Sequence, residues 1–280
     1  MKIDGRIISS EILLKLSKRV SKLKKKGITP TMAIILMGDN EASKIYVRQK
    51  GIKAQEIGAK VKVYPVTNQT SSNDLEELVK KLDKNSRVHG VIIQRPAAPN
   101  IDANALTELI SGVKEIDGFG NHSKYPVPVA KASLILIENA FEQINSKSTF
   151  LNWLKKQKIV IIGKGETAGH PILEFLNKRG LRPYVIDSKT PSKEKLLKEA
   201  DIIITAVGKT ILSSKQIKKG VILVGVGLYS DQKGKLKGDY DNLDVENVAS
   251  FYSPTPGGVG PVNVACLLEN LVKAAENSSK

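Results

Sequence analysis

Short apolar runs typical of β-strands alternate along the whole chain with longer stretches of amphipathic, helical periodicity. This rhythm predicts mostly parallel sheets covered by helices, because each parallel strand needs a crossover to reach its neighbour. The runs expected to form strands are Met32–Leu36, Val61–Tyr64, Gly90–Ile93, Lys158–Ile162, Arg182–Ile186, Ile202–Ala206 and Val221–Val224. The stretches expected to form helices are Ser9–Lys26, Ala42–Gly58, Ser72–Leu82, Ala103–Leu109, Ala132–Gln143, Gly169–Arg179, Ser192–Glu199 and Val262–Glu276. The predicted fold class is therefore α/β.

The length of the chain, 280 residues, suits two domains better than one core. Glycines and prolines gather between Asp117 and Ala130, which predicts a hinge there, and a second junction is expected at Pro254–Pro261. We expect a first domain over residues 1–125 and a second over residues 126–261. The last helix, within residues 262–280, is expected to return to the first domain.

Cysteine and histidine are too scarce for several kinds of site. Cys266 is the single cysteine, so a disulfide within the chain is excluded and a reducing cytoplasm is expected. The three histidines are scattered, so no metal centre is predicted. The start of the chain has no apolar segment typical of a signal peptide, and no apolar run approaches the ~20 residues of a membrane helix.

The chain is strongly basic, with 44 Lys and Arg against 28 Asp and Glu and a formal net charge of +16. Such a charge raises the question of nucleic-acid binding. The basic residues are spread along the chain, however, and aromatic residues do not interleave with them as a stacking surface requires. We therefore predict no nucleic-acid partner and interpret the charge as a general bias or as suited to anionic small substrates.

A glycine-rich turn follows the apolar run Lys158–Ile162 and precedes a helical stretch. The turn, Gly163–Gly169, has the spacing G-x-G-x3-G, which lets backbone approach a phosphate at a helix N-terminus. A plain tight turn remains the alternative. After the next predicted strand, Asp187 favours the ribose of NAD, whereas Ser188 and Lys189 favour the 2′-phosphate of NADP. The residues alone leave the cofactor open.

Polar residues with catalytic potential lie in the first half. Tyr46 and Lys50 are one helical turn apart and share a face, and a lysine in a cleft can transfer protons. A surface lysine is the ordinary interpretation in so basic a chain. Gln94 follows a predicted strand and Asp117 lies in a polar turn; a strand-end cap and an Asx-turn are their ordinary interpretations.

Several motifs together resemble those of the methylenetetrahydrofolate dehydrogenase/cyclohydrolase family. Tyr46 and Lys50 match its Y-x-x-x-K pair, in the family-like string Ser43–Lys50. Further matching segments, in order along essentially the whole chain, are Ile3–Gly5, His89–Gln94, Lys114–Phe119, Ala206–Lys209 and Pro254–Pro261. The last is a near-complete copy of the family's P-x-P-G-G-V-G-P signature.

The resemblance implies two reactions of one-carbon metabolism, which also serves purine biosynthesis. Hydride passes from 5,10-methylenetetrahydrofolate to NAD(P)+, and water then opens the methenyl product to 10-formyltetrahydrofolate. By the resemblance, Lys50 is the central catalytic group and Gln94 hydrogen-bonds it. Tyr46 lies against the folate and Asp117 anchors the pterin.

The resemblance also implies two sets of binding residues. The cofactor, NADP with NAD possible, would contact Gly163, Lys164, Gly165, Thr167, Gly169, Ser188, Lys189, Val207, Gly208 and Gly227. The tetrahydrofolate derivative would contact Tyr46, Asp117, Pro256, Gly257 and Gly258. The family further implies a Rossmann-type NAD(P)-binding domain after an α/β catalytic domain, and a cytoplasmic homodimer.

The chain departs from the family pattern mainly on the nucleotide side and between the domains. The family's G-R-S is Gly163–Gly165, its H-S-R/K-T is Asp187–Thr190 and its D-V-G is Gly225–Gly227. Its P-C-T-P is Pro128–Lys131, and its L-P-L-P after Gln94 begins with Arg95. These changes leave three alternatives: a cyclohydrolase alone, an NAD-directed variant, and a non-catalytic folate or nucleotide binder. An unrelated NAD-dependent dehydrogenase would explain the glycine turn but not the first-half motifs.

Overall fold

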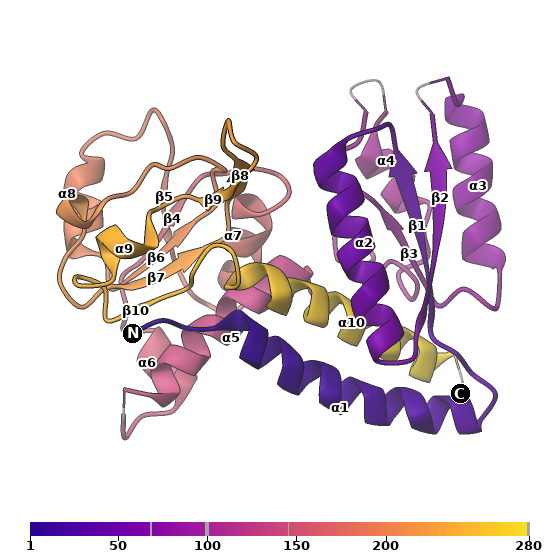
Figure 1. Ribbon diagram of the computed structural model, residues 1–280, viewed down its shortest axis with the longest axis horizontal. Helices are drawn as coiled ribbons and strands as arrows, with labels where there is room; N and C mark the ends of the chain where they lie inside the picture. The colour runs from indigo at the N-terminus through magenta and orange to yellow at the C-terminus, as the bar shows by residue number, and fades with distance from the viewer. Residues whose placement is uncertain (68, 99–100, 145, 279–280) are drawn as a thin grey trace. The chain divides into compact units, whose positions relative to one another are not determined.

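The computed structural model describes the chain except residues 68, 99–100, 145 and 279–280, and the side chain of residue 42 (Figure 1). The chain divides into two compact units. One comprises Ser9–Pro128 with Val264–Lys280, and the other Met1–Ile8 with Val129–Asn263. We call them the three-stranded and the five-stranded unit, after their main sheets. The last two residues of the predicted return helix, 279 and 280, lie outside the described part.

The three-stranded unit has a parallel sheet in the order β2-β1-β3. Its strands are β1 (Thr31–Met37), β2 (Lys60–Val66) and β3 (Gly90–Ile93). Its helices are α1 (Gly5–Lys25), α2 (Glu41–Glu56), α3 (Ser72–Lys84), α4 (Ala103–Glu108) and α10 (Val259–Asn277), of which α1 and α10 each begin in the other unit. The prediction that the C-terminal helix returns to the first domain is therefore confirmed.

Strand β1 is buried along its whole length and separates two aliphatic cores. Its even-numbered side chains pack against α1, α2 and α10, and its odd-numbered side chains pack against α3 and α4. This follows from the period of two along a strand, because a central parallel strand covered on both faces needs apolar side chains at every position. In the sequence, this requirement is visible as the continuous apolar run Met32–Leu36.

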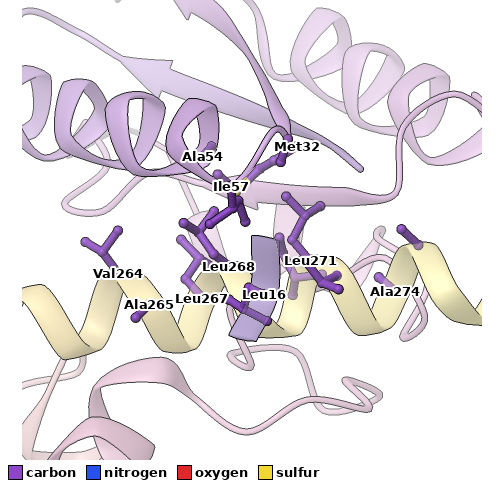
Figure 2. Close-up of a cluster of buried hydrophobic side chains, with 14 of the residues drawn as sticks. Leu16, Met32, Ala54, Ile57, Val264, Ala265, Leu267, Leu268, Leu271 and Ala274 are labelled. Carbon is purple, nitrogen blue, oxygen red and sulfur yellow. The ribbon is translucent and has the colours of Figure 1, made fainter. Parts of the chain in front are cut away.

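Helix α10 fills the first of these cores. Figure 2 shows Leu267, Leu268 and Leu271 of α10 among side chains from α1, α2 and β1. On the neighbouring helix, Arg19 of α1 forms an ion pair with Glu276 of α10 at 2.6 Å. The folding of this unit therefore depends on a helix that is distant in sequence.

The five-stranded unit has a parallel sheet in the order β10-β7-β6-β4-β5. Its strands are β4 (Ile159–Ile162), β5 (Tyr184–Ile186), β6 (Ile202–Thr205), β7 (Ile222–Gly225) and β10 (Phe251–Tyr252), with a small hairpin of β8 (Leu228–Ser230) and β9 (Leu236–Gly238). Its helices are α5 (Pro128–Glu142), α6 (Phe150–Leu154), α7 (Gly169–Asn177), α8 (Lys193–Glu199) and α9 (Asn242–Val245), with a 3-10 turn at Ser214–Gln216.

The strand order changes direction at β4. The crossover through α7 leads from β4 to β5 on one side, and the next crossover, through α8, returns to β6 on the other side. Open α/β sheets bind ligands at the carboxyl ends of the strands where the strand order changes direction, so a ligand crevice is expected at the loops after β4 and β6. This topology puts the glycine turn and the segment Ala206–Lys209 next to each other.

Several boundaries differ from the sequence-based expectation. The last helix begins at Val259, inside the predicted Pro254–Pro261 junction, because Pro261 lies in the first helical turn, where no N–H is needed. Helix α5 likewise begins at Pro128, within the predicted hinge. The short elements α6, α9, β8, β9 and β10 were not predicted, since two to five residues carry too little periodicity. Within the described residues, none of the helices has the length and apolar character needed to cross a membrane.

Replacement of Leu268 by alanine is expected to lower the free energy of unfolding of the three-stranded unit by about 2–5 kcal/mol, because it leaves a cavity in a close-packed core. Urea unfolding followed by circular dichroism measures the change. Leu14→Ala is the control, since Leu14 is 61% exposed on α1. An equal loss in both variants would contradict the role of α10 in the core.

Candidate active site

Helix α2 carries the predicted catalytic lysine into the interior. The side chain of Asn40 caps the helix by accepting a hydrogen bond from the Ser43 N–H at 2.9 Å, which fixes where the helix begins. Tyr46 and Lys50 follow on one face, with Tyr46 partly buried and Lys50 only 9% exposed. The interpretation of Lys50 as an ordinary surface lysine is therefore wrong.

Lys50 meets Gln94 at the end of β3. Its Nζ donates to Gln94 Oε1 at 2.9 Å, and Gln94 Nε2 donates to the Arg95 carbonyl at 2.7 Å. Both side chains are buried. Because the second bond identifies the amide nitrogen, the amide oxygen is left to accept from the lysine. The structure thus joins two residues that are 44 positions apart in sequence.

Asp117 is electrostatically coupled to the same lysine. Burial lowers the pKa of Lys50, and the negative charge of Asp117 partly opposes this shift. Burial raises the pKa of Asp117, and the positive charges of Lys50 and Arg95 oppose that shift. Desolvation therefore brings the lysine closer to a pKa at which it can both give and take a proton near neutral pH. Burial also raises the pKa of the Tyr46 phenol, which keeps that group neutral.

The loop that carries Asp117 is held by a second buried carboxylate. Glu115, 1% exposed, accepts hydrogen bonds from the N–H groups of Asp117, Gly118 and Gly120 at 3.0, 3.1 and 3.2 Å. Burial, reinforced by the charge of Asp117, raises the pKa of Glu115 to about 7. From α10, Asn270 Nδ2 donates to the Ile116 and Pro126 carbonyls at 2.9 and 3.0 Å. Asp117 is thus presented by a loop fixed from two sides.

Glu115, Arg95 and Asn270 were not assigned a role from the sequence. Arg95 lies 4.7 Å from the centre of the Phe119 ring and donates to Asn104 Oδ1 at 2.8 Å, which holds its charge near the Asp117 loop. A signal for Glu115 did exist, because it precedes the apolar Ile116 and a carboxylate has to be paired when it is buried. The sequence around Asn270 contains no such signal, since the partners of Asn270 lie more than 140 residues away.

The glycine turn after β4 has the shape that close approach of a ligand requires. Gly163 has a φ of +100°, and a Cβ on it would lie 2.6 Å from the Ala206 carbonyl oxygen. A Cβ on Gly169, the first residue of α7, would lie 2.1 Å from the Gly163 carbonyl oxygen. Gly165 faces open space. Glycines thus pack strand, turn and helix closely together, and Lys164, Gly165 and Thr167 lie in the turn that precedes the helix N-terminus.

At the end of β5, Asp187 is the centre of a polar network. Its carboxylate forms an ion pair with Lys164 at 3.0 Å and accepts from the Lys189 N–H and the Thr190 hydroxyl at 3.0 and 2.9 Å. The Lys164 hydrogen bond is the main reason that the pKa of Asp187 is lowered to about 2, so the group is ionised at neutral pH. Ser188 is the neighbouring residue on this loop.

The segments after β6 and β7 also meet at the crevice. The Val207 side chain lies beside the turn, since a Cβ on Gly163 would be 3.1 Å from Val207 Cγ2. Asp239 accepts hydrogen bonds from the N–H groups of Val207 and Gly208 at 3.1 and 2.7 Å. A Cβ on Gly227 would lie 2.2 Å from the Asp239 carboxylate oxygens. The five-stranded unit therefore brings all ten predicted cofactor residues to the carboxyl ends of β4, β5, β6 and β7.

The predicted folate residues fall in both units. Tyr46 and Asp117 belong to the three-stranded unit, whereas Pro256, Gly257 and Gly258 belong to the five-stranded unit. There, Gly257 has a φ of +105° and its carbonyl accepts from the Gly5 N–H at 2.8 Å. A Cβ on Gly5 would lie 1.8 Å from the Gly258 carbonyl oxygen. The Pro254–Pro261 motif is thus packed directly on the start of the chain.

Both halves of the chain match sequence descriptions of known domains. Residues 3–117 match the tetrahydrofolate dehydrogenase/cyclohydrolase catalytic domain, and residues 146–279 match the NAD(P)-binding domain of the same proteins. The chain belongs to the tetrahydrofolate dehydrogenase/cyclohydrolase family. Its two-domain α/β fold, predicted from the sequence, is confirmed.

Individual relatives cover nearly the whole chain. The bifunctional protein FolD of Nitrosopumilus maritimus is 36% identical over 284 residues, which span 100% of this chain and 98% of that protein. The crystal structure of FolD from Campylobacter jejuni, a methylenetetrahydrofolate dehydrogenase/cyclohydrolase, is 33% identical with a TM-score of 0.90 and covers 99% of each chain. The Trypanosoma brucei dehydrogenase-cyclohydrolase, solved with NADP and an inhibitor, is 26% identical with a TM-score of 0.83, over 100% of this chain and 98% of that one.

The raised pKa of Glu115 predicts how stability changes with pH. Between the unfolded value of 4.5 and the folded value of about 7, the native state holds a proton that the unfolded state has released. The free energy of unfolding should therefore fall as pH rises through this window, by about 3 kcal/mol from this group. Glu115→Gln cannot titrate and should lack this decrease.

Chemical unfolding of both proteins at pH 4.5 to 7.5 measures the difference, in which titrating groups that do not interact with Glu115 cancel. Glu76→Gln, on the exposed face of α3, is the matched control and should follow the wild type. Parallel curves for the wild type and Glu115→Gln would contradict a buried, titrating Glu115.

Proposed function

We propose that the protein oxidises 5,10-methylenetetrahydrofolate with a nicotinamide nucleotide and hydrolyses the methenyl product to 10-formyltetrahydrofolate. The observation that carries this proposal is the buried Lys50 in a chain of this family. Lys50 is hydrogen-bonded to Gln94 and interacts electrostatically with Asp117. Burial of an ammonium group costs free energy unless the group is paired. A buried lysine with a shifted pKa beside a carboxylate and an amide oxygen is typical of an active site.

Asp117 is suited to anchor the pterin ring of the folate. A carboxylate has only acceptor oxygens when it is ionised, and the amino and ring N–H groups of a pterin are donors that two such oxygens can take together. Burial raises the pKa of Asp117, and the charges of Lys50 and Arg95 oppose that shift by favouring the ionised form. Tyr46, partly buried one turn before Lys50, offers an aromatic face for the flat part of the substrate.

Lys50 is proposed to move the protons of the hydrolysis. Water adds to the methenyl carbon and loses a proton. The hydroxyl so formed then loses its own proton as the formyl C=O forms, the bond from that carbon to one of its two ring nitrogens breaks, and that nitrogen is protonated, so that one proton is released overall. A lysine with a lowered pKa can take the first proton and return one to the nitrogen. Gln94 orients the amine through its amide oxygen at 2.9 Å.

The crevice at β4 and β6 fits a nicotinamide nucleotide. When bound, the nicotinamide ring supplies the hydride acceptor for the oxidation. The close packing of Gly163 and Gly169 holds the turn at the N-terminus of α7, where backbone N–H groups and the helix dipole favour a pyrophosphate. The other residues of the family's cofactor set surround the same crevice, so the protein's task is to align two rings and exclude water.

NADP+ is our first candidate as cofactor, because Lys164, Ser188 and Lys189 offer two cations and a hydroxyl for a 2′-phosphate. A specific observation also favours NAD+. The ionised Asp187 holds Lys164 in an ion pair, and its carboxylate would repel a 2′-phosphate while accepting from ribose hydroxyls. The choice depends on whether Lys164 leaves Asp187 for the phosphate.

Methenyl formation with NAD+ and with NADP+ at matched concentrations tests the whole proposal. Turnover with either cofactor supports the dehydrogenase, and hydrolysis without turnover would support the cyclohydrolase alone. If the protein catalyses neither reaction but binds folate, the non-catalytic alternative is supported. A cytoplasmic homodimer with no nucleic-acid partner and a part in purine biosynthesis stay predictions from the resemblance and the charge pattern.

Lys50→Met is expected to lower methenyl hydrolysis at least about a hundredfold, because it keeps the aliphatic volume but removes the proton-transferring amine. Spectrophotometric loss of the methenyl compound measures the rate. Lys53→Met, on the exposed side of the same helix where Lys53 pairs with Glu56, should retain the wild-type rate. Full hydrolysis by Lys50→Met would rule out the assigned role.

Asp187→Ser is expected to raise the ratio of kcat/KM for NADP+ to kcat/KM for NAD+ by at least about tenfold, or about 1.4 kcal/mol. The variant removes the charge that repels a 2′-phosphate and releases Lys164. Steady-state dehydrogenase kinetics with both cofactors measure the ratio. Asp231→Ser, in the turn of the β8–β9 hairpin, is the control. An unchanged ratio would show that Asp187 does not discriminate.

A further inference from the structure

Asp239 is a fully buried carboxylate that lies below the dinucleotide crevice and outside the set of residues derived from the family resemblance. It follows β9, and its exposed fraction is 0%. Its Oδ1 accepts from the N–H groups of Gly208 and Lys209 at 2.7 and 3.1 Å, and its Oδ2 accepts from the Val207 N–H at 3.1 Å. A carboxylate with several backbone donors is held firmly, because each of these bonds is strengthened by the charge.

The three donors belong to consecutive residues of the loop after β6. Consecutive N–H groups that point into one concavity form the kind of nest that binds anions, including phosphates. Here an anion of the protein itself fills the nest. The N–H groups of Val207, Gly208 and Lys209 are therefore already used, and they are not available to a phosphate of a bound nucleotide.

The same interaction fixes how the loop faces the crevice. Gly208 has a φ of +77°, so the chain can turn sharply around the carboxylate. The Val207 side chain, 38% exposed, is directed to the turn at Gly163. From the other side, Gly227 leaves no room for a side chain, because a Cβ there would lie 2.2 Å from both Asp239 oxygens. Asp239 thus lies between the loops after β6 and β7.

We propose that Asp239 is a positioning residue of the dinucleotide site, which holds the loop Val207–Lys209 so that the Val207 side chain, and not the loop's N–H groups, contacts the nicotinamide nucleotide. The inference rests on the proposed function, since it concerns the cofactor of that reaction. It separates two parts of the crevice: the Gly163–Gly169 turn, whose glycines let a phosphate approach the backbone, and an apolar wall kept in place by a buried charge.

The bifunctional reaction provides an internal control for this role, because hydrolysis of the methenyl compound needs no nucleotide. Asp239→Asn keeps the shape of the side chain but turns one acceptor into a donor that opposes the loop's N–H groups. We expect the Kd and the KM for the preferred cofactor to rise at least tenfold, with cyclohydrolase kcat/KM within about twofold of the wild type. Calorimetric titration with NAD+ and NADP+ and the two activity assays measure these quantities.

Asp241→Asn is the matched control. It makes the same change two residues further on, where Asp241 is exposed and caps α9 by accepting from the Leu243 N–H at 2.9 Å. It should leave the cofactor Kd unchanged. A merely structural role for Asp239 would lower the melting temperature and leave the cofactor Kd and KM of the folded Asp239→Asn protein unchanged, which would overturn the inference.

A measurement on the wild type keeps the test independent of how well the variant folds. Amide hydrogen exchange should find the N–H groups of Val207, Gly208 and Lys209 protected without nucleotide, with no further protection when NAD+ or NADP+ is added. Fast exchange in the free protein that slows on nucleotide binding would overturn the inference. A wild type that binds neither nucleotide would overturn the proposed dehydrogenase as well, so the two failures are distinguishable.

Discussion

Burial of a charged group among aliphatic side chains is the constraint that shapes both halves of this protein. The cores are built almost entirely from isoleucine, leucine, valine and alanine, so a charge inside them is stable only where hydrogen bonds replace water. Glu115 and Asp239 are held by the same kind of contact, although burial still raises the pKa of Glu115 to about 7. Each accepts three backbone N–H groups, and in each case the donors come from the loop that carries the proposed ligand contacts. Loop shape is thereby fixed from inside the fold.

Lys50 meets the same constraint with a different outcome. Its partners are an amide oxygen and a nearby carboxylate, which compensate less of the lost hydration than a full set of charge-assisted bonds would. The part of the desolvation free energy that these partners do not compensate lowers the pKa of Lys50. A residue that is only partly compensated is closer to changing its protonation state, and this property suits Lys50 to proton transfer.

The sequence was sufficient for the parts that depend on local pattern. Buried parallel strands such as β1 and β6 are continuous apolar runs, and the turn from Gly163 to Gly169 has a recognisable order of glycines between strand and helix. The pairing of Lys50 with Gln94 followed from the family resemblance, since spacing alone favoured a surface lysine. Asn270 and Asp239 were beyond reach, because their roles arise from contacts with backbone far away in sequence. Short elements such as β10 owe their conformation to a neighbouring strand more than to their own residues.

The position of α10 has a consequence for the order of events during synthesis. The side chains of Leu267, Leu268 and Leu271 belong to the core of the three-stranded unit, yet the ribosome makes them only after residues 129–263 of the other unit. Domains generally fold as units as they emerge, and the five-stranded unit gains its continuous stretch of chain first. The three-stranded unit is begun earlier and completed later. Until α10 arrives, one face of its sheet exposes apolar surface, and Asn270 is not yet present to hold the loop of Asp117.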